Sequence, residues 1–117
     1  MNDTRLYPTP PSSRSRGALE LLRERGIDPL VIAYLDNPPS AAELRDLLGT
    51  LGLPARDLLR TGEDEYAALG LADESLAESA LIDAMVQHPR LIERPIFVHG
   101  GRAVIGRPPE RVLELLD

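Results

Sequence analysis

The stretches that decide the fold of this chain are Leu91-Ile92-Glu93-Arg94-Pro95-Ile96 and Val104-Ile105-Gly106-Arg107-Pro108-Pro109. Each places an arginine directly before a proline, beside a short run of apolar residues that favour β-structure. The residue before a proline is steered towards extended backbone, so each arginine is expected at the edge of a strand. His99-Gly100-Gly101 joins the two runs and predicts a hairpin that presents two guanidinium groups to one anion. The alternative interpretation is a pair of ordinary surface arginines at strand ends.

The chain before this hairpin begins with a β-α-β pattern. Thr4–Tyr7 is a short β-prone segment, and Ser12 and Ser13 offer hydroxyl groups that can cap a following helix. Gly26 is a good residue to end that helix. Leu30–Leu35 is a continuous apolar run, which is typical of a strand buried on both faces of a parallel sheet. We therefore expect this run to be a central strand, parallel to the strand that ends at Tyr7.

A block of helices separates this pattern from the hairpin. Ser40 and Glu43 have the spacing of a capping box, and the helix that they open is expected to end near residues 49–52. Short helical segments are expected at residues 54–62, closed by Gly62, and at 64–69. A longer helix is expected from Asp73-Glu74-Ser75 to Pro89, and a final one over residues 110–116. The order of these elements predicts an α/β, thioredoxin-like fold with a β-α-β / β-β-α core. We expect a single domain over residues 1–117, with a helical subdomain inserted at about residues 40–88.

Composition excludes several classes of function. The 117 residues carry a net charge of −6 and no Trp, and they include only one Phe and three Tyr. A nucleic-acid binder needs a basic face or exposed aromatic rings, so no nucleic-acid partner is expected. No cysteine is present, and His88 and His99 lack metal-ligand spacing, so no metal site is expected. No apolar run reaches membrane-spanning length, and a cytoplasmic protein without a membrane partner is expected.

Several stretches, taken in order and at their spacing, resemble the glutaredoxin-linked arsenate reductases. They are Ser13-Arg14-Ser15-Arg16, Tyr34-Leu35, Glu43-Leu44, Asp57-Leu58-Leu59-Arg60-Thr61-Gly62-Glu63, His88-Pro89 and the two arginine-proline stretches. The resemblance runs from Tyr7 almost to the end of the chain. It implies a thioredoxin-like fold with a helical insertion and a cis peptide bond before Pro95. It also implies that Arg60, Arg94 and Arg107 bind the oxyanion.

The resemblance fails in the loop that carries the family's catalytic cysteine. The family loop reads His-Asn-Pro-Arg-Cys-Ser-Lys-Ser-Arg, whereas this chain reads Pro8-Thr9-Pro10-Pro11-Ser12-Ser13-Arg14-Ser15-Arg16. Ser12 therefore stands at the position of the nucleophile. A serine hydroxyl needs an adjacent general base, and this loop has no His, Asp or Glu. Ser12 is better interpreted as a helix cap or an oxyanion contact than as a nucleophile.

Three functional hypotheses follow. The first is a family member that keeps an arginine-lined pocket for arsenate, phosphate or sulfate, but lacks thiol-dependent arsenate reduction and binds no cofactor. The second is a working reductase, with glutathione as co-substrate and glutaredoxin as partner, if the natural protein has cysteine at position 12. The third is a protein-interaction or regulatory module that uses the Leu6-Tyr7 face and the first helix.

Arg60 also has a purely structural interpretation, as a cation at a helix C-terminus. The acidic stretch Glu63-Asp64-Glu65 is expected to be a solvated helix face.

Overall fold

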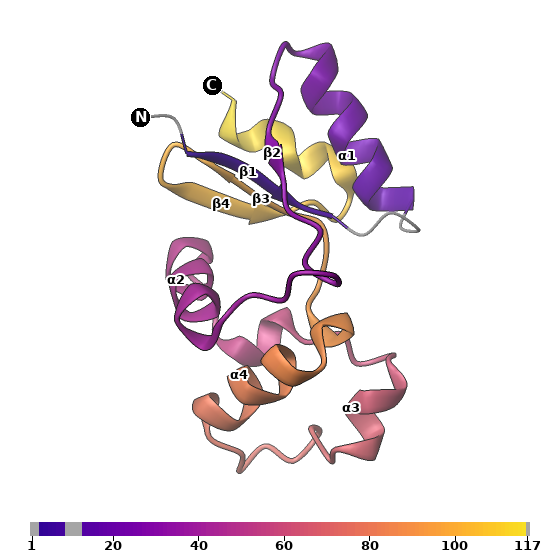
Figure 1. Cartoon of the computed structure of the whole chain (residues 1–117), viewed down its shortest axis with the longest axis vertical. Helices are drawn as coiled ribbons and strands as arrows, with labels where there is room; N and C mark the ends of the chain where they lie inside the picture. The colour runs from indigo at the N-terminus through magenta and orange to yellow at the C-terminus, as the bar shows by residue number, and fades with distance from the viewer. Residues whose placement is uncertain (1–2, 9–12, 117) are drawn as a thin grey trace. The chain divides into compact units, whose positions relative to one another are not determined.

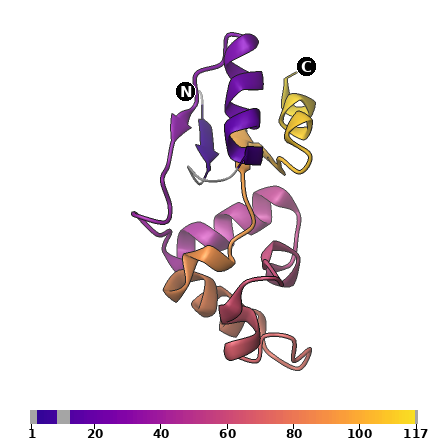
Figure 2. The same cartoon turned by 90° about the vertical axis from the view of Figure 1, so that its right-hand side faces the viewer.

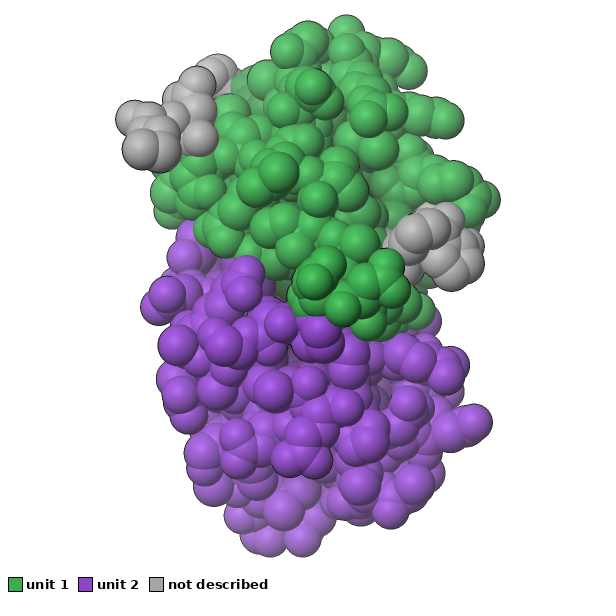
Figure 3. Space-filling view, viewed as in Figure 1, with its two compact units in different colours: residues 1–37, 94–117 green, residues 38–93 purple. Residues whose placement is uncertain are grey.

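The computed structural model describes residues 3–8 and 13–116. The chain forms two compact units, one of residues 1–37 and 94–117 and the other of residues 38–93 (Figure 3). The helical insertion expected at about residues 40–88 falls within the second unit. None of the helices in the described residues is long and apolar enough to cross a membrane.

The first unit is built on a four-stranded sheet in the order β2-β1-β3-β4. Its strands are β1 (Thr4–Tyr7), β2 (Leu30–Val31), β3 (Ile96–His99) and β4 (Arg102–Ile105). β1 runs parallel to β2 and antiparallel to β3, and β3 and β4 form the expected hairpin. Gly100 and Gly101 both have positive φ, which the tight turn of a two-residue hairpin requires. The sheet is therefore mixed, as the β-α-β / β-β-α prediction demands.

Helix α1 (Ser13–Glu24) and the 3₁₀ helix η3 (Pro109–Leu115) pack together on one face of this sheet (Figures 1 and 2). Leu6, Phe97 and Val104 lie side by side across three strands and form the core with residues of both helices. Gly26 has a φ of 76°, and its N–H bonds the Arg23 carbonyl, so it ends α1 as expected.

The proposed docking face at Leu6 and Tyr7 is wrong. Leu6 is fully buried in the core, and Tyr7 is only 1% exposed. The Tyr7 hydroxyl also accepts a hydrogen bond from Arg5 Nη1 at 2.6 Å. Neither side chain is available to a partner, because short-range periodicity does not show which face of a strand the helices cover.

The prediction of a central strand over Leu30–Leu35 is also wrong, although its parallel pairing with β1 is confirmed. β2 spans only Leu30–Val31, lies at the edge of the sheet, and leaves Leu30 65% exposed. The last link of this ladder is the Ile32 N–H to the Leu6 carbonyl, at 2.9 Å. Pro8 follows Tyr7 and has no N–H to donate, so β1 cannot extend the pairing. The chain turns instead at Ala33, whose carbonyl accepts from Asp36 and Asn37.

The second unit is helical. It contains α2 (Ala41–Leu51), η1 (Ala55–Leu58), α3 (Asp64–Ala68), α4 (Glu78–Gln87) and η2 (Pro89–Leu91). The Ser40 hydroxyl caps α2 by accepting from the Glu43 N–H at 3.1 Å, and Gly52, with a φ of 71°, ends it. α4 packs against α2, η1 and η2. The buried residues of α2 and α4 are Leu44, Leu47, Leu48, Leu81, Ile82, Ala84 and Met85.

Helix α4 begins at Glu78, later than the expected start at Asp73-Glu74-Ser75. The Asp73 carboxylate accepts from the Ser75 N–H at 2.9 Å and from the Ser75 hydroxyl at 2.6 Å. These hydrogen bonds lower the pKa of Asp73 below its usual value. Such a local turn competes with helix formation, so the acidic and hydroxyl residues form a loop before the helix.

Candidate anion-binding site

Arg94 and Arg107 lie at the same end of the β3–β4 hairpin. Ile96 is paired with Ile105, and the Gly106 N–H donates to the Pro95 carbonyl at 2.8 Å. Arg94 and Arg107 each stand one residue beyond this last link, at the open end of the hairpin and away from the Gly100-Gly101 turn. Both arginines are half-buried. The peptide bond before Pro95 is cis, as the resemblance implied, and the bond between Arg107 and Pro108 is cis as well.

Close packing holds the two arginine-proline junctions together. A Cβ added to Gly106 would lie 2.9 Å from Pro95 Cγ and 3.1 Å from Val112 Cγ1. Only glycine fits at this position, since the Pro95 ring cannot swing away as a flexible side chain would. Gly106 therefore lets the Pro95 ring lie against the backbone that leads into Arg107.

The end of β1 and the start of α1 lie at the end of the sheet where the two arginine-proline junctions lie. Tyr7 is paired with Ile96, so β1 ends where β3 begins. A Cβ on Gly17 of α1 would lie 3.5 Å from Pro109 Cγ, so the beginning of α1 lies beside the segment that follows Arg107. The first turn of α1 contains no acidic residue, and the dipole of a helix N-terminus attracts anions. Ser12, at the family's cysteine position, lies outside the described residues.

Arg60 belongs to the other unit and has a well-defined set of partners there. Residue 59 is extended and not helical, because Leu59 forms an antiparallel bridge with Ile92. The Arg60 N–H donates to the Leu91 carbonyl at 2.8 Å, which fixes its backbone. The expected position of Arg60 at a helix C-terminus is therefore wrong.

The guanidinium of Arg60 is part of an ion-pair network. Its Nε lies 3.1 Å from Glu63 Oε2, and its Nη1 lies 2.9 Å from Glu93 Oε1. Arg90 Nη2 contacts the other oxygen of Glu63 at 3.1 Å. The side chain of Glu63 is only 12% exposed, so the expectation of a solvated face fails for this residue. Two arginines and two glutamates balance in formal charge, and the network ties residues 60–63 to residues 90–93.

Glu93 and Gly106 were missed as functional positions by sequence reasoning. Both stand inside the two arginine-proline stretches, each directly before its arginine. The signal that could have found them is their place in the repeated motif, since Glu93-Arg94-Pro95 and Gly106-Arg107-Pro108 align residue for residue. The role of each residue follows only from the structure. Glu93 forms an ion pair with Arg60, and the lack of a side chain at Gly106 leaves room for the Pro95 ring.

A mixed four-stranded sheet with helices on one face, joined to a helical unit inserted between its halves, defines this chain as a thioredoxin-like α/β protein. The sequence profile of the ArsC family matches residues 7–115. The chain therefore belongs to the ArsC family.

Three proteins illustrate the likeness. The arsenate reductase of Vibrio cholerae, a solved structure, has a TM-score of 0.93 and 48% identity, covering 96% of both chains. The arsenate reductase of Neisseria meningitidis serogroup B is 44% identical over 117 residues, which is 99% of this chain and 100% of that protein. The uncharacterized protein YfgD of Escherichia coli K12 is 55% identical over 113 residues, 96% of this chain and 95% of that protein.

Proposed function

We propose that this protein binds a small tetrahedral oxyanion at the open end of the β3–β4 hairpin, with Arg94 and Arg107 as its ligands. The single observation that carries the proposal is the link between Pro95 and Gly106, which brings the two arginine-proline junctions together at the open end of the hairpin. The end of β1 and helix α1 lie beside these junctions. Arsenate, phosphate and sulfate share the required chemistry, which is a set of oxygens that accept charged hydrogen bonds.

Each guanidinium offers a planar fork that fits two oxygens of such an anion. The N–H groups at the start of α1 add donors that need no counter-charge. The protein carries a net charge of −6, so its overall electrostatic field repels anions. Binding is therefore expected to depend on these local groups.

Arg60 has a weaker place in the proposal. Its Nε and Nη1 are already bonded to Glu63 and Glu93, which share its charge. An anion that approached Arg60 would also meet both carboxylates. We therefore assign Arg60 first to the ion-pair network, and only second to the anion.

We also propose that these residues do not reduce arsenate by the thiol route. Reduction to arsenite takes two electrons, which thiols supply as they are oxidised to a disulfide. The chain contains no cysteine, and a serine at position 12 cannot supply those electrons. A bound anion would keep its oxidation state. Glutathione and glutaredoxin enter only if a cysteine stands at position 12.

Isothermal titration calorimetry with arsenate and with phosphate tests the proposal. We expect one saturable site, and about tenfold weaker binding in Arg94→Gln and in Arg107→Gln, since each removes charged hydrogen bonds. Arg25→Gln is the matched control, because Arg25 is exposed and has no side-chain partner among the described residues. Equal affinity in all four proteins, or no binding to either anion, would contradict the assignment.

A further inference from the structure

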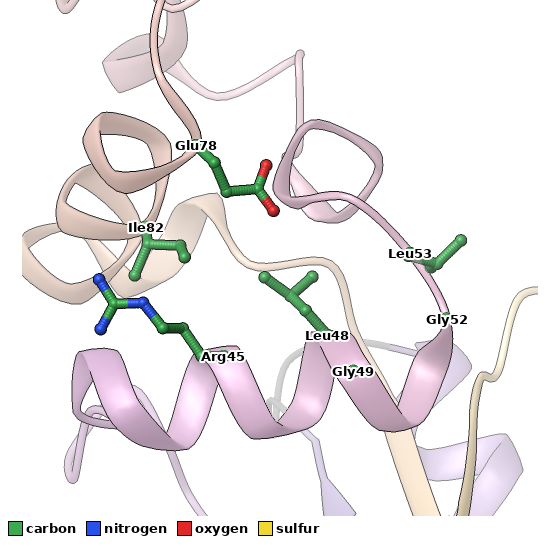
Figure 4. Close-up of a pocket in the computed structure, with 7 residues that line it drawn as sticks. All are labelled: Arg45, Leu48, Gly49, Gly52, Leu53, Glu78 and Ile82. Carbon is green, nitrogen blue, oxygen red and sulfur yellow. The ribbon is translucent and has the colours of Figure 1, made fainter.

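The second unit contains a cavity that the proposed anion site does not use. It lies between α2 and α4, has a volume of about 510 Å³, and is lined by Arg45, Leu48, Gly49, Gly52, Leu53, Glu78 and Ile82. This volume lies in the range of small-molecule sites. In Figure 4, Arg45 and Leu48 project from α2 towards α4, and Ile82 projects from α4 towards α2. The cavity thus combines an apolar floor with two charged groups of opposite sign.

The two charged groups differ in what they are bonded to. Both oxygens of the Glu78 carboxylate accept from the Ala55 N–H at 3.1 Å. Glu78 is therefore already bonded to the first residue of η1. Arg45 makes no ion pair or hydrogen bond with any residue that the structure describes. An anionic group in the cavity would therefore be attracted to Arg45 and repelled from Glu78, which fixes its orientation.

Gly49 is a second, independent observation. It stands inside α2 without a positive φ, and a Cβ added there would meet nothing within 4 Å. Neither the backbone nor the packing needs a glycine at this position, although glycine weakens a helix relative to alanine. Gly52 is different, because its φ of 71° ends the helix. The missing side chain at Gly49 leaves the wall of the cavity open to a ligand.

From these observations we propose that the cavity binds a small carboxylate with an apolar body, its carboxylate on Arg45 and its body on Leu48 and Ile82. The backbone of Gly49 forms the wall that the body lies against. A second carboxylate on the ligand would be repelled by the carboxylate of Glu78, so the ligand class is a monocarboxylate. This inference is independent of the proposed oxyanion site, which lies in the other unit.

Nuclear magnetic resonance titration with octanoate, and with octanamide as its uncharged match, tests the proposal. We expect saturable amide shifts confined to residues 45–53 and 78–82, and binding of octanamide about threefold to fivefold weaker. Arg45→Gln should weaken octanoate by the same factor and leave octanamide unchanged. Gly49→Leu should weaken both at least tenfold while it keeps the helix, since leucine is a good helix former.

Arg25→Gln is again the control and should leave both affinities unchanged. Equal affinity for the acid and the amide, or an Arg45→Gln variant that binds octanoate normally, would overturn the proposal. So would the lack of any saturable shift up to about 10 mM octanoate, a concentration well above the dissociation constant of a weak specific site. Thermal unfolding of each variant checks that the fold is kept.

Discussion

Single residues decide how the two arginine-proline junctions come together. Gly106 lies where β4 ends, and a methyl group there would lie 2.9 Å from the ring of Pro95. Carbon atoms in ordinary contact are about 3.5–4.0 Å apart, so the backbone would have to shift. The same position has no positive φ, which means that the need for glycine comes from packing and not from backbone conformation.

Gly106→Ala is therefore expected to lower the free energy of unfolding by about 1–3 kcal/mol, the usual cost of overpacking. Urea unfolding followed by circular dichroism measures it. Gly62→Ala is the matched control, because a Cβ at Gly62 meets nothing within 4 Å and its φ is not positive. An unfolding free energy for Gly106→Ala equal to that of the control would mean that Pro95 and Val112 adapt to the methyl group.

The elements of the second unit are delimited by local signals at their ends. α2 has the Ser40 hydroxyl at its start and the left-handed Gly52 at its end, and both were readable in the sequence. α4 lacks a side-chain cap, and its expected start was displaced by the Asp73–Ser75 turn. Helix ends were thus predictable where one residue satisfied the backbone, and unpredictable where side chains competed for it.

Gly49 and Gly52 offer a test at this scale, since they are three residues apart and have opposite roles. Gly49→Ala should raise the free energy of unfolding by about 0.5–1 kcal/mol, because alanine is the better helix former. Gly52→Ala should lower it by about 1 kcal/mol, because a φ of 71° is unfavourable for any residue with a Cβ. Thermal and urea unfolding would measure both. Changes of the same sign would show that these backbone arguments do not govern α2.

Over the molecule as a whole, the fold is that of the ArsC family, whereas the sequence of residues 8–12 differs from the family loop quoted above. Pro8, Pro10 and Pro11 lack N–H groups. Pro11 also stands at the position where the resemblance implies an arginine. A thiolate in that loop would have fewer backbone donors and less positive charge to lower its pKa. We therefore propose that this chain shares the family fold without the family's thiol chemistry.

Ser12→Cys is expected to give partial arsenate reductase activity with glutathione and glutaredoxin, well below that of relatives with the full loop. Ser12→Cys combined with Pro11→Arg should be faster, since the added cation lowers the thiol pKa. Turnover of arsenate and the pH dependence of thiol alkylation measure the two effects. The unmodified chain is the control and should show no turnover. Full activity from Ser12→Cys alone would show that the prolines do not limit the reaction.

The sequence by itself determined the family, the hairpin and most helix ends. Each of these depends on residues close together in the chain, such as Gly100-Gly101 or Ser40 with Glu43. The same is true of the pairing of Ile96 with Ile105, which follows once the hairpin turn is known.

Only the tertiary structure decided which residues are buried and which charges are paired. Leu30 is exposed and Tyr7 buried because of which strands lie at the edge and which face the helices cover. Arg60 finds Glu93 at a separation of 33 residues, through a bridge between Leu59 and Ile92 that no local pattern encodes. Burial and ion pairing depend on chain segments that meet only after folding, whereas caps and turns are set by the backbone groups of adjacent residues.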